Sequence, residues 1–373
     1  MIAAANRRRR RWILGIPPRG AEALRQFAQA RAPAILRSTV LEGNLRILLR
    51  AVTLVFLLIM GAMSIRAQQK GQYVPGQQGL NAGVLPDPGF TYVNMALNYY
   101  ADTLKNANGG SLPLSTDYNI WADENIFFYV PKGKFLGAKF APYIAAPVIA
   151  NGSLTLGAVN FPNLTVSGGG AGIADTWVEP INLGWSLKRA DVNVGYAFMA
   201  PTGRYTPGAT DNVGSGYWGN NITTGSTVYL TKNKGTTANL FTNWEAHGSK
   251  TSSFGTRLTP GQAFTMEWGL GQTLPLKKDF SLLGQLGLLG YDQWQVSSNE
   301  GLVAPNVPAN TFPYYSVHAI GFQTNFIVPA KALNFFFKFE SEYRALARPQ
   351  GRTIAFGVTW TLRIPKRQPP AKP

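Results

Sequence analysis

The chain has 373 residues, of which 40 are Gly, 12% are aromatic and only 14% are charged. Average soluble domains are about 25% charged, so this composition favours β-structure that is rich in turns. The absence of Cys excludes disulfides, thiolate metal sites and cysteine nucleophiles. Length leaves the domain count open, because closed β-architectures of this size form single units.

The formal net charge of +17 is concentrated near the N-terminus. Residues 1–67 hold 12 Arg and two acidic residues, Glu22 and Glu42. Taken from totals of 35 basic and 18 acidic residues, this leaves 23 and 16 for the remainder, a net charge of only +7. No basic stretch interleaved with aromatic residues follows that would stack on bases. The charge therefore predicts no nucleic-acid partner.

An uncharged apolar run of 13 residues, at positions 51–63, follows Arg46 and Arg50. A membrane-spanning helix needs about 20 such residues, whereas a secretory signal needs about 7 to 15 behind a basic region. Residues 1–67 are therefore interpreted as a cleaved signal region, with a mature chain that begins near Gln68. The basic region is unusually long, so residues 1–40 are expected to precede the true translation start. A single anchoring helix over residues 45–65 is the alternative.

From about residue 90 onward the hydrophobic pattern has a period of two, which is typical of strands with one dry face. It is clearest in residues 333–346, where an apolar face alternates with a face that carries Lys338, Glu340 and Glu342. Strands are predicted at residues 90–100, 118–130, 135–149, 173–187, 191–199, 223–231, 237–247, 264–274, 281–296, 314–328, 333–346 and 353–362. A further candidate at 154–166 contains Gly157 and Pro162, which leaves both 12 and 14 strands open for an even-numbered barrel.

Segments of about 10 residues, apolar on one face and polar on the other, match the strands of a transmembrane antiparallel β-barrel. The predicted barrel covers residues 89–362. Aromatic residues near strand ends are expected in its interfacial girdles: Tyr99, Tyr100, Trp177, Trp185, Trp294 and Trp360. A soluble sandwich or propeller would show the same alternation, but the export signal and the aromatic residues near strand ends favour a membrane barrel.

Several stretches between Pro88 and Leu362 resemble a known family. They are Pro88-Gly89-Phe90, residues 170–175 followed by Pro180, Leu183 and Trp185, then Ala200-Pro201-Thr202-Gly203-Arg204-Tyr205, Asn212-Val213-Gly214 with Trp218, and the hairpin 333–362. Together they resemble the outer-membrane protein family of the meta-pathway of phenol degradation. The resemblance implies a barrel that transports aromatic and other hydrophobic compounds. The basic, Pro-rich tail 363–373 departs from barrels that end on an aromatic residue.

The motif Pro201-Thr202-Gly203, ahead of Tyr205, is predicted to make a tight turn after Met199, because Pro fixes φ and Gly accepts a positive φ. Asp175 and Glu179 are expected to point into the lumen and to pair with Arg189 or Arg204, or to bind a cation. The lumen-facing candidates are Asp175, Glu179, Glu267, Tyr291, Lys338, Glu340 and Glu342. A reversed charge at Lys338 is expected to stay hydrated in a water-filled lumen.

Residues 68–88 are rich in Gly and Gln and show no strand pattern. They are expected in the barrel mouth or lumen as a plug, with a free periplasmic tail as the alternative. The predicted function is an outer-membrane channel of a Gram-negative bacterium for small, hydrophobic or aromatic molecules. It requires no cofactor and no metal, and its partners are outer-membrane lipid and the solute; no oligomeric state follows from the pattern.

Two other functions are consistent with a barrel: a lipid hydrolase, and a structural barrel with a closed lumen. The hydrolase would need one of the two His residues, His247 or His318, beside a nucleophile. Neither lies in a recognisable nucleophile motif, and the spacing excludes an HExxH metal site. The sequence therefore predicts no catalytic residues.

Overall fold

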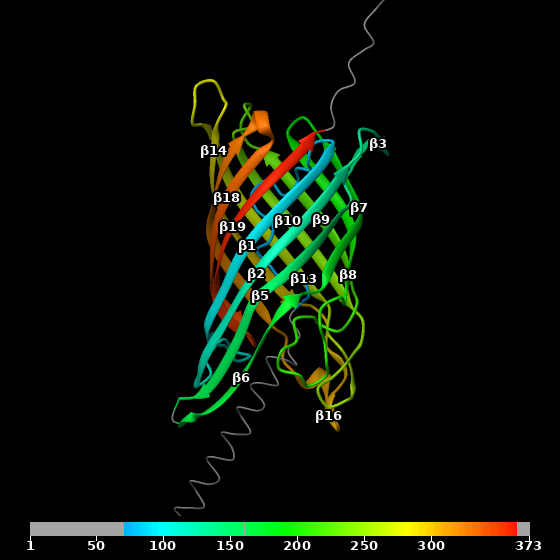
Figure 1. Cartoon of the computed structure of the whole chain (residues 1–373), viewed down its shortest axis with the longest axis vertical. Coiled ribbons are helices and arrows are strands. Elements are labelled where there is room, and N and C mark those ends of the chain that lie inside the picture. The colour runs from blue at the N-terminus through cyan, green and yellow to red at the C-terminus, as the bar shows by residue number, and fades with distance from the viewer. Residues whose placement is uncertain (1–70, 160, 364–373) are drawn as a thin grey trace, which may run out of the picture. The chain divides into compact units, whose positions relative to one another are not determined.

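The computed structural model describes residues 71–159 and 161–363, which form a closed antiparallel β-barrel (Figure 1). The predicted all-β barrel is confirmed. Its wall strands are β1 (Gly89–Leu104), β2 (Leu114–Val130), β5 (Tyr143–Ala158), β6 (Phe161–Ile173), β7 (Thr176–Ser186), β8 (Ala190–Ala200), β9 (Gly219–Tyr229), β10 (Thr236–His247), β13 (Ala263–Pro275), β14 (Leu283–Gln295), β17 (Ser316–Val328), β18 (Leu333–Leu346) and β19 (Pro349–Arg363).

The strands β6 and β7 are two parts of one wall strand, because both pair with β5 in a continuous antiparallel register. Val148 lies opposite Ile173, and Ala145 lies opposite Trp177. The chain bends between the two parts, and the wall therefore has 12 strands, as predicted. The barrel closes where β1 pairs with β19, from Gly89 opposite Arg363 onward.

The residues on the two faces of the wall differ in chemistry, as the alternation predicted. Outward residues such as Leu288 and Phe356 are more than half exposed, at 58% and 54%. Inward neighbours such as Gln285 and Lys338 are buried. Because an apolar exterior around a polar interior is what lipid outside and water inside require, the pattern is that of a membrane barrel.

The chain between residues 134 and 173 differs from the prediction. The predicted strands 135–149 and 154–166 leave a gap at residues 150–153, but this stretch is a bulge inside β5, between Ile149 and Gly152. The reversals lie instead at Leu136 and Gly137, which have φ values of 51° and 74°, and after Ala158. A bulge and a turn use the same residue types, so composition did not separate them.

The two ends of the barrel differ in the length of their connections. At the end that carries Gly89 and Arg363, short turns join the strands, and this end also holds β3 (Lys134–Phe135), β4 (Ala138–Phe140) and η2 (Pro329–Lys331). At the other end lie the long loops 201–218, 248–262 and 296–315. Outer-membrane barrels place short turns in the periplasm and long loops outside, so we assign the loop end as extracellular.

The extracellular loops contain a small sheet of their own. It is formed by β11 (Lys250–Thr251), β12 (Arg257–Thr259), β15 (Glu300–Ala304) and β16 (Val307–Pro308), with η1 (Ala309–Thr311) beside it. Leu258, Val303 and Ala309 form its buried core. The long loops are therefore packed against one another at the mouth.

The predicted signal region and most of the C-terminal tail lie outside the described residues. Within residues 71–159 and 161–363, no helix has the length and apolar character needed to cross a membrane.

Replacing Phe337 by Arg tests the outward face. The Phe337 ring packs against Phe356 and Phe322, at 5.0 and 5.8 Å between ring centroids. An Arg facing lipid near the bilayer midplane costs about 2 to 4 kcal/mol, so Phe337→Arg should reduce the heat-modifiable, folded fraction on gels. Phe280→Arg, in an exposed turn, is the control and should fold normally. Equal folding of the two variants would contradict the assignment of faces.

Candidate functional site

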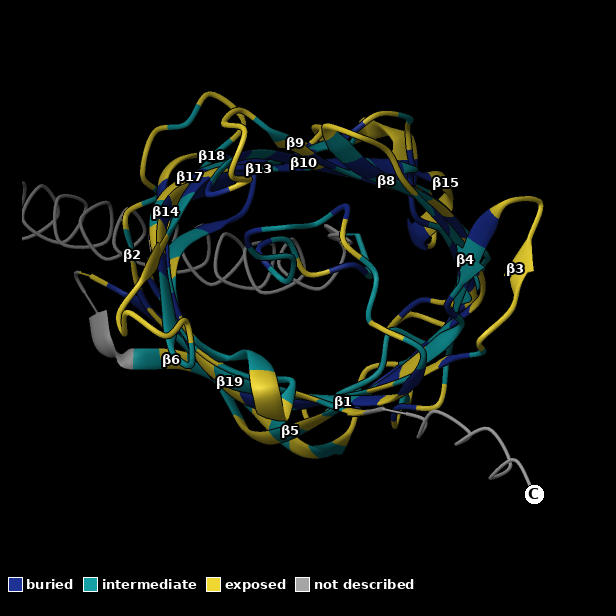
Figure 2. Ribbon diagram, turned by 90° about the horizontal axis from the view of Figure 1, so that it is seen from above, coloured by how far each residue is buried: buried dark blue, intermediate teal, exposed yellow. Residues whose placement is uncertain are grey.

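Residues 71–88, here called the lumenal segment, run through the barrel before β1 begins (Figure 2). At the extracellular end, the amide of Gly71 donates to the Tyr315 hydroxyl at 2.6 Å. At the periplasmic end, Lys139 Nζ donates to the carbonyl oxygen of Pro86 at 3.0 Å. The segment therefore passes along the lumen from one end to the other.

Glu267 of β13 binds the middle of the lumenal segment. Its Oε1 accepts hydrogen bonds from Tyr73 Oη at 2.7 Å and from the Gly76 amide at 2.8 Å, and its Oε2 accepts from the Gln78 amide at 2.9 Å. Lys338 of β18 donates from the other side to the carbonyl oxygens of Gly76 and Gln78. One buried acid and one buried base thus satisfy both the donors and the acceptors of this stretch.

The same pairing continues along the segment. Each wall group is a side chain on the lumenal face of its strand, and each satisfies a polar group of the segment that would otherwise be buried without a partner. The pairs are Tyr73 N to Glu245 Oε2 at 3.1 Å, Leu80 N to Gln323 Oε1 at 3.3 Å, Asn81 N to Asn239 Oδ1 at 2.9 Å, Gly83 N to Thr227 Oγ1 at 2.9 Å and Asn193 Nδ2 to Ala82 O at 2.9 Å.

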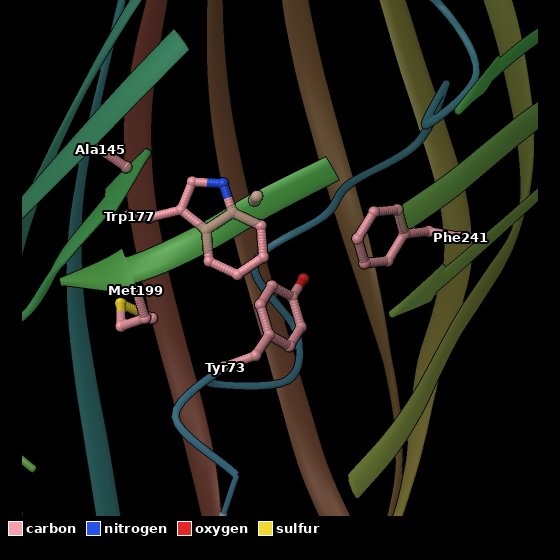
Figure 3. Close-up of a cluster of buried hydrophobic side chains, with 6 residues drawn as sticks. Tyr73, Ala145, Trp177, Met199 and Phe241 are labelled. Atoms are coloured by element: carbon pink, nitrogen blue, oxygen red, sulfur yellow. The ribbon is translucent and has the colours of Figure 1, made fainter. Parts of the chain in front are cut away.

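Tyr73 also anchors the segment by apolar packing (Figure 3). Its ring lies 5.8 Å from Trp177 and 5.7 Å from Phe241, between ring centroids. Met199, Ala145 and Ala197 complete the buried cluster. Trp177 is therefore an interior residue, and its predicted place in the interfacial girdle is wrong.

Gly76 is required where the segment meets the charged wall. Its φ of 84° lies in the left-handed region, and a Cβ there would lie 2.4 Å from Glu340 Oε2. Any larger residue would push the segment away from Lys338 and Glu340. A Gly-rich sequence thus allows the backbone itself to approach the wall.

A cavity of about 270 Å³ remains between the lumenal segment and the wall of β1, β2 and β5. Its wall side mixes apolar and aromatic residues, such as Ile126, Phe128 and Phe336, with polar residues, such as Asn182, Thr223 and Gln323. Glu124, Glu179 and Lys338 add charge at a few points. The cavity could hold one small molecule with an apolar body and a few polar groups.

Glu342 of β18 connects β1 and β14 by hydrogen bonds at the extracellular end of the lumen. It accepts hydrogen bonds from the hydroxyls of Tyr99 and Tyr291, both at 3.0 Å, and pairs with Arg348 at 3.4 Å. Tyr99, which was expected in the outer girdle, therefore points inward. The geometry gives Tyr291 and Glu342 a structural role at this mouth.

Asp175 and Glu179 have other partners than the Arg residues predicted for them. Asp175 accepts hydrogen bonds from the amides of Gly203 and Ser215, at 3.0 and 2.8 Å. Glu179 accepts from Trp177 Nε1 at 3.2 Å and from Thr223 at 3.3 Å. Their local backbone and side-chain donors satisfy both carboxylates, so distant guanidinium groups are not needed.

Arg204 and Arg189 bind elsewhere. Arg204 pairs with Asp211 at 3.1 Å on an exposed loop, and Arg189 donates to the Leu230 carbonyl at 3.3 Å. The expected pairing with Asp175 or Glu179 is therefore wrong.

The motif Pro201-Thr202-Gly203 begins with a tight turn, in which the Thr202 amide donates to the Ala200 carbonyl at 2.8 Å. Gly203 does not take the expected positive φ, and the turn opens a long loop that ends at Trp218. Thr202 Oγ1 accepts from the Thr176 amide at 3.0 Å and thereby fixes the loop to β7. Gly203 is needed for space, because a Cβ on it would lie 2.6 Å from the Cα of Gly214. The hydroxyl of Tyr205, further along, donates to the Thr251 carbonyl at 2.5 Å.

Lys338 is only 2% exposed, and Glu340 lies beside it at 3.8 Å. The expectation that a charge at position 338 would stay hydrated is therefore wrong, because the lumenal segment covers it. Sequence reasoning also missed Glu124 and Glu245, which lie on the lumenal faces of β2 and β10. The alternation of those strands would have placed both residues inward.

The two His residues have structural partners. His247 is buried, with Nδ1 at 2.9 Å from the Gly261 carbonyl oxygen and Nε2 at 3.3 Å from Glu245. His318 Nδ1 lies 2.6 Å from Asp292 on the outward face. Within the described ranges, no cluster of His, Asp and Glu residues forms a metal site.

The geometry defines a class: a 12-stranded outer-membrane type of β-barrel with a segment of its own chain in the lumen. A family model described as "Putative MetA-pathway of phenol degradation" matches residues 101–357, so the chain belongs to this family. This confirms the resemblance that the sequence motifs indicated.

Among solved structures, the COG4313 outer membrane channel from Pseudomonas putida F1 is similar, with a TM-score of 0.61 and 12% identity over 78% of this chain and 100% of that one. The β domain of the Bordetella autotransporter BrkA has a TM-score of 0.46 and 8% identity over 74% and 100% of the two chains. A Pseudomonas aeruginosa FadL homologue has a TM-score of 0.31 and 9% identity over 73% and 89%. No curated protein matches the chain.

Replacing Glu267 by Ala tests the anchoring of the lumenal segment. The change removes three hydrogen bonds to a charged acceptor, so the segment should leave the wall more often. In an Ala82→Cys background, labelling by a water-soluble maleimide should accelerate by roughly tenfold or more, since hydrogen bonds to charged groups contribute about 1.5 to 3 kcal/mol each. Glu300→Ala, in an exposed loop strand, is the control; an unchanged labelling rate for Glu267→Ala would contradict the assigned anchor.

Proposed function

We propose that the protein is a channel of the bacterial outer membrane for small hydrophobic or aromatic molecules. The observation that carries the proposal is the cavity of about 270 Å³ inside a closed barrel with an apolar exterior. Its wall side presents Phe128, Ile126 and Phe336 to the passage, beside polar groups such as those of Asn182 and Asn193. A mixed lining of this kind suits a small molecule with an aromatic body and a polar substituent. The family's description, which links it to phenol degradation, agrees with an aromatic solute.

The lumenal segment is the plug of this channel in our proposal. Its hydrogen bonds to β8, β9, β10, β13 and β17 hold it against one side of the lumen. Most of the wall residues that line the free volume belong to β1, β2, β5, β7 and β18. A solute would pass between the segment and this wall, in contact with both.

Transport fits the barrel better than hydrolysis does. His318 has an acidic partner, Asp292, but Trp268 donates to the same carboxylate at 3.1 Å and aromatic rings surround the imidazole. Ser249, near His247, is hydrogen-bonded to Thr259 and Arg257. These contacts hold the side chains in structural pairs, and we propose that the protein is not an enzyme.

Deletion of residues 68–85 should raise single-channel conductance in planar bilayers, because the lumenal segment occupies cross-section that ions would otherwise use. Heat-modifiable gel mobility should show that the barrel still folds, since the wall strands begin at Gly89. An unchanged conductance in a folded deletion variant would show that the segment does not obstruct the pore.

A pair of amino acids tests the selectivity of the channel in liposome swelling. Phenylalanine and glutamine share one zwitterionic backbone, and phenylalanine is the larger of the two. An aromatic passage should admit phenylalanine faster, and Phe336→Gln should reduce this preference. Protein-free liposomes correct for passage through lipid. If swelling follows solute size alone, the protein is a general pore.

A further inference from the structure

A second cavity, of about 360 Å³, lies at the extracellular end of the barrel. It shares no lining residue with the lumen cavity. One side is formed by the outer parts of β2, β5 and β6, and the other by the loops 201–218 and 248–262. It lies where a solute arriving from outside first meets the protein.

The cavity lies beside β6, whose outer part has a strand on one side only. Along one edge β6 pairs with β5, and it is the last strand of the sheet on its other edge. A loop covers that free edge instead of a strand, through the Gly169 amide, which donates to the Thr210 carbonyl at 2.8 Å. Loops seal a sheet edge less completely than a strand does, and space remains between them.

The lining of this cavity combines apolar side chains with aromatic rings. Ile120, Ile149 and Leu154 come from the strands, and Tyr205 and Phe254 come from the loops. Phe254 is 50% exposed although it is a large apolar side chain. Such a lining favours a flat apolar molecule, which would also cover Phe254.

Lys250 is the one charged side chain among the described residues that line the cavity. Its Nζ lies 5.1 Å from the centre of the Tyr205 ring and 5.7 Å from that of Tyr217. Within the described part of the chain, no carboxylate lies within 4.0 Å of the ammonium group. The charge thus faces aromatic rings and has no counter-ion of its own.

The charges around Lys250 are consistent with the binding of an anion beside its ammonium group. Burial lowers the pKa of Lys250 to about 8, against the opposing effect of Asp175, which already accepts hydrogen bonds from Gly203 and Ser215. Burial also raises the pKa values of Tyr205 and Tyr217, so both rings stay neutral. Arg257 on the neighbouring strand donates to Ser249. An anion placed beside Lys250 would stabilise its charged form.

We propose that this cavity is an external binding site for a single-ring aromatic carboxylate or phenolate, whose charged oxygen pairs with Lys250 while its ring packs on Tyr205, Phe254 and Ile149. We infer from this site that the transported solute is an acidic aromatic molecule. This step rests on the proposed channel function. Binding here would concentrate the solute at the mouth before it reaches the lumen.

Benzoate is the probe, with toluene as its neutral counterpart, and calorimetry on the full barrel in lipid nanodiscs measures both. We expect benzoate to bind the unmodified protein and Lys250→Met to weaken it by about tenfold, the loss of one charge-assisted contact. Toluene binding should not change in Lys250→Met. Lys234→Met is the matched control, because Lys234 also lies over a Tyr ring, at 4.4 Å, but at the periplasmic end.

The pH dependence gives an independent readout. A lowered lysine pKa means that the ammonium is present below about 8 and is lost above it, so benzoate affinity should fall as the pH rises through this value. Lys250→Met should show no such fall. No benzoate binding to the unmodified protein, or equal weakening by Lys250→Met and Lys234→Met, would overturn the proposal. Swelling with phenylalanine, measured in parallel on the same variants, reports on the channel separately: swelling without benzoate binding refutes this site alone.

Discussion

A chain that crosses lipid must pair every backbone donor and acceptor within itself, and for strands this requires a closed cylinder. The pairing of β1 with β19 provides the closure here. Closure fixes the diameter, and 12 strands enclose more space than the lumenal side chains of the wall fill. The route of the lumenal segment and the lumen cavity follow from this excess of space.

The lumenal segment and the buried charges of the wall depend on one another. Glu267 and Lys338 would be expensive to bury alone, because an unpaired charge loses its hydration without compensation. The segment supplies backbone amides to the first and backbone carbonyls to the second. The charges in turn define the position of the segment along the barrel, as buried polar pairs do when they specify one arrangement among several. Apolar packing of Tyr73 alone would define it less well.

The sequence predicted the wall better than the contents of the lumen. Alternation in residues 333–346 placed Lys338 and Glu340 inward, since the side-chain period of a strand is local. Trp177 and Glu179 are two residues apart on one strand, so their side chains share a face. The pattern that placed Glu179 inward could therefore have placed Trp177 inward too. The partners of Asp175 and the path of residues 71–88 could not be predicted in this way, because their contacts join residues up to 262 positions apart. The bulge at Gly152 also escaped prediction, because a strand bulge and a turn favour the same residues.

The position of the lumenal segment in the membrane-embedded protein is the central claim, and a disulfide tests it most directly. The chain has no Cys of its own, so an introduced pair reacts without background. Ala82→Cys with Asn193→Cys joins two residues in contact, since Asn193 Nδ2 donates to the Ala82 carbonyl at 2.9 Å. Ala82→Cys with Thr359→Cys, on the opposite wall of the cavity, is the mismatched pair. On mild oxidation of intact outer membranes, the first pair should cross-link and the second should not; no cross-link in the first pair, or equal cross-linking in both, would contradict the account.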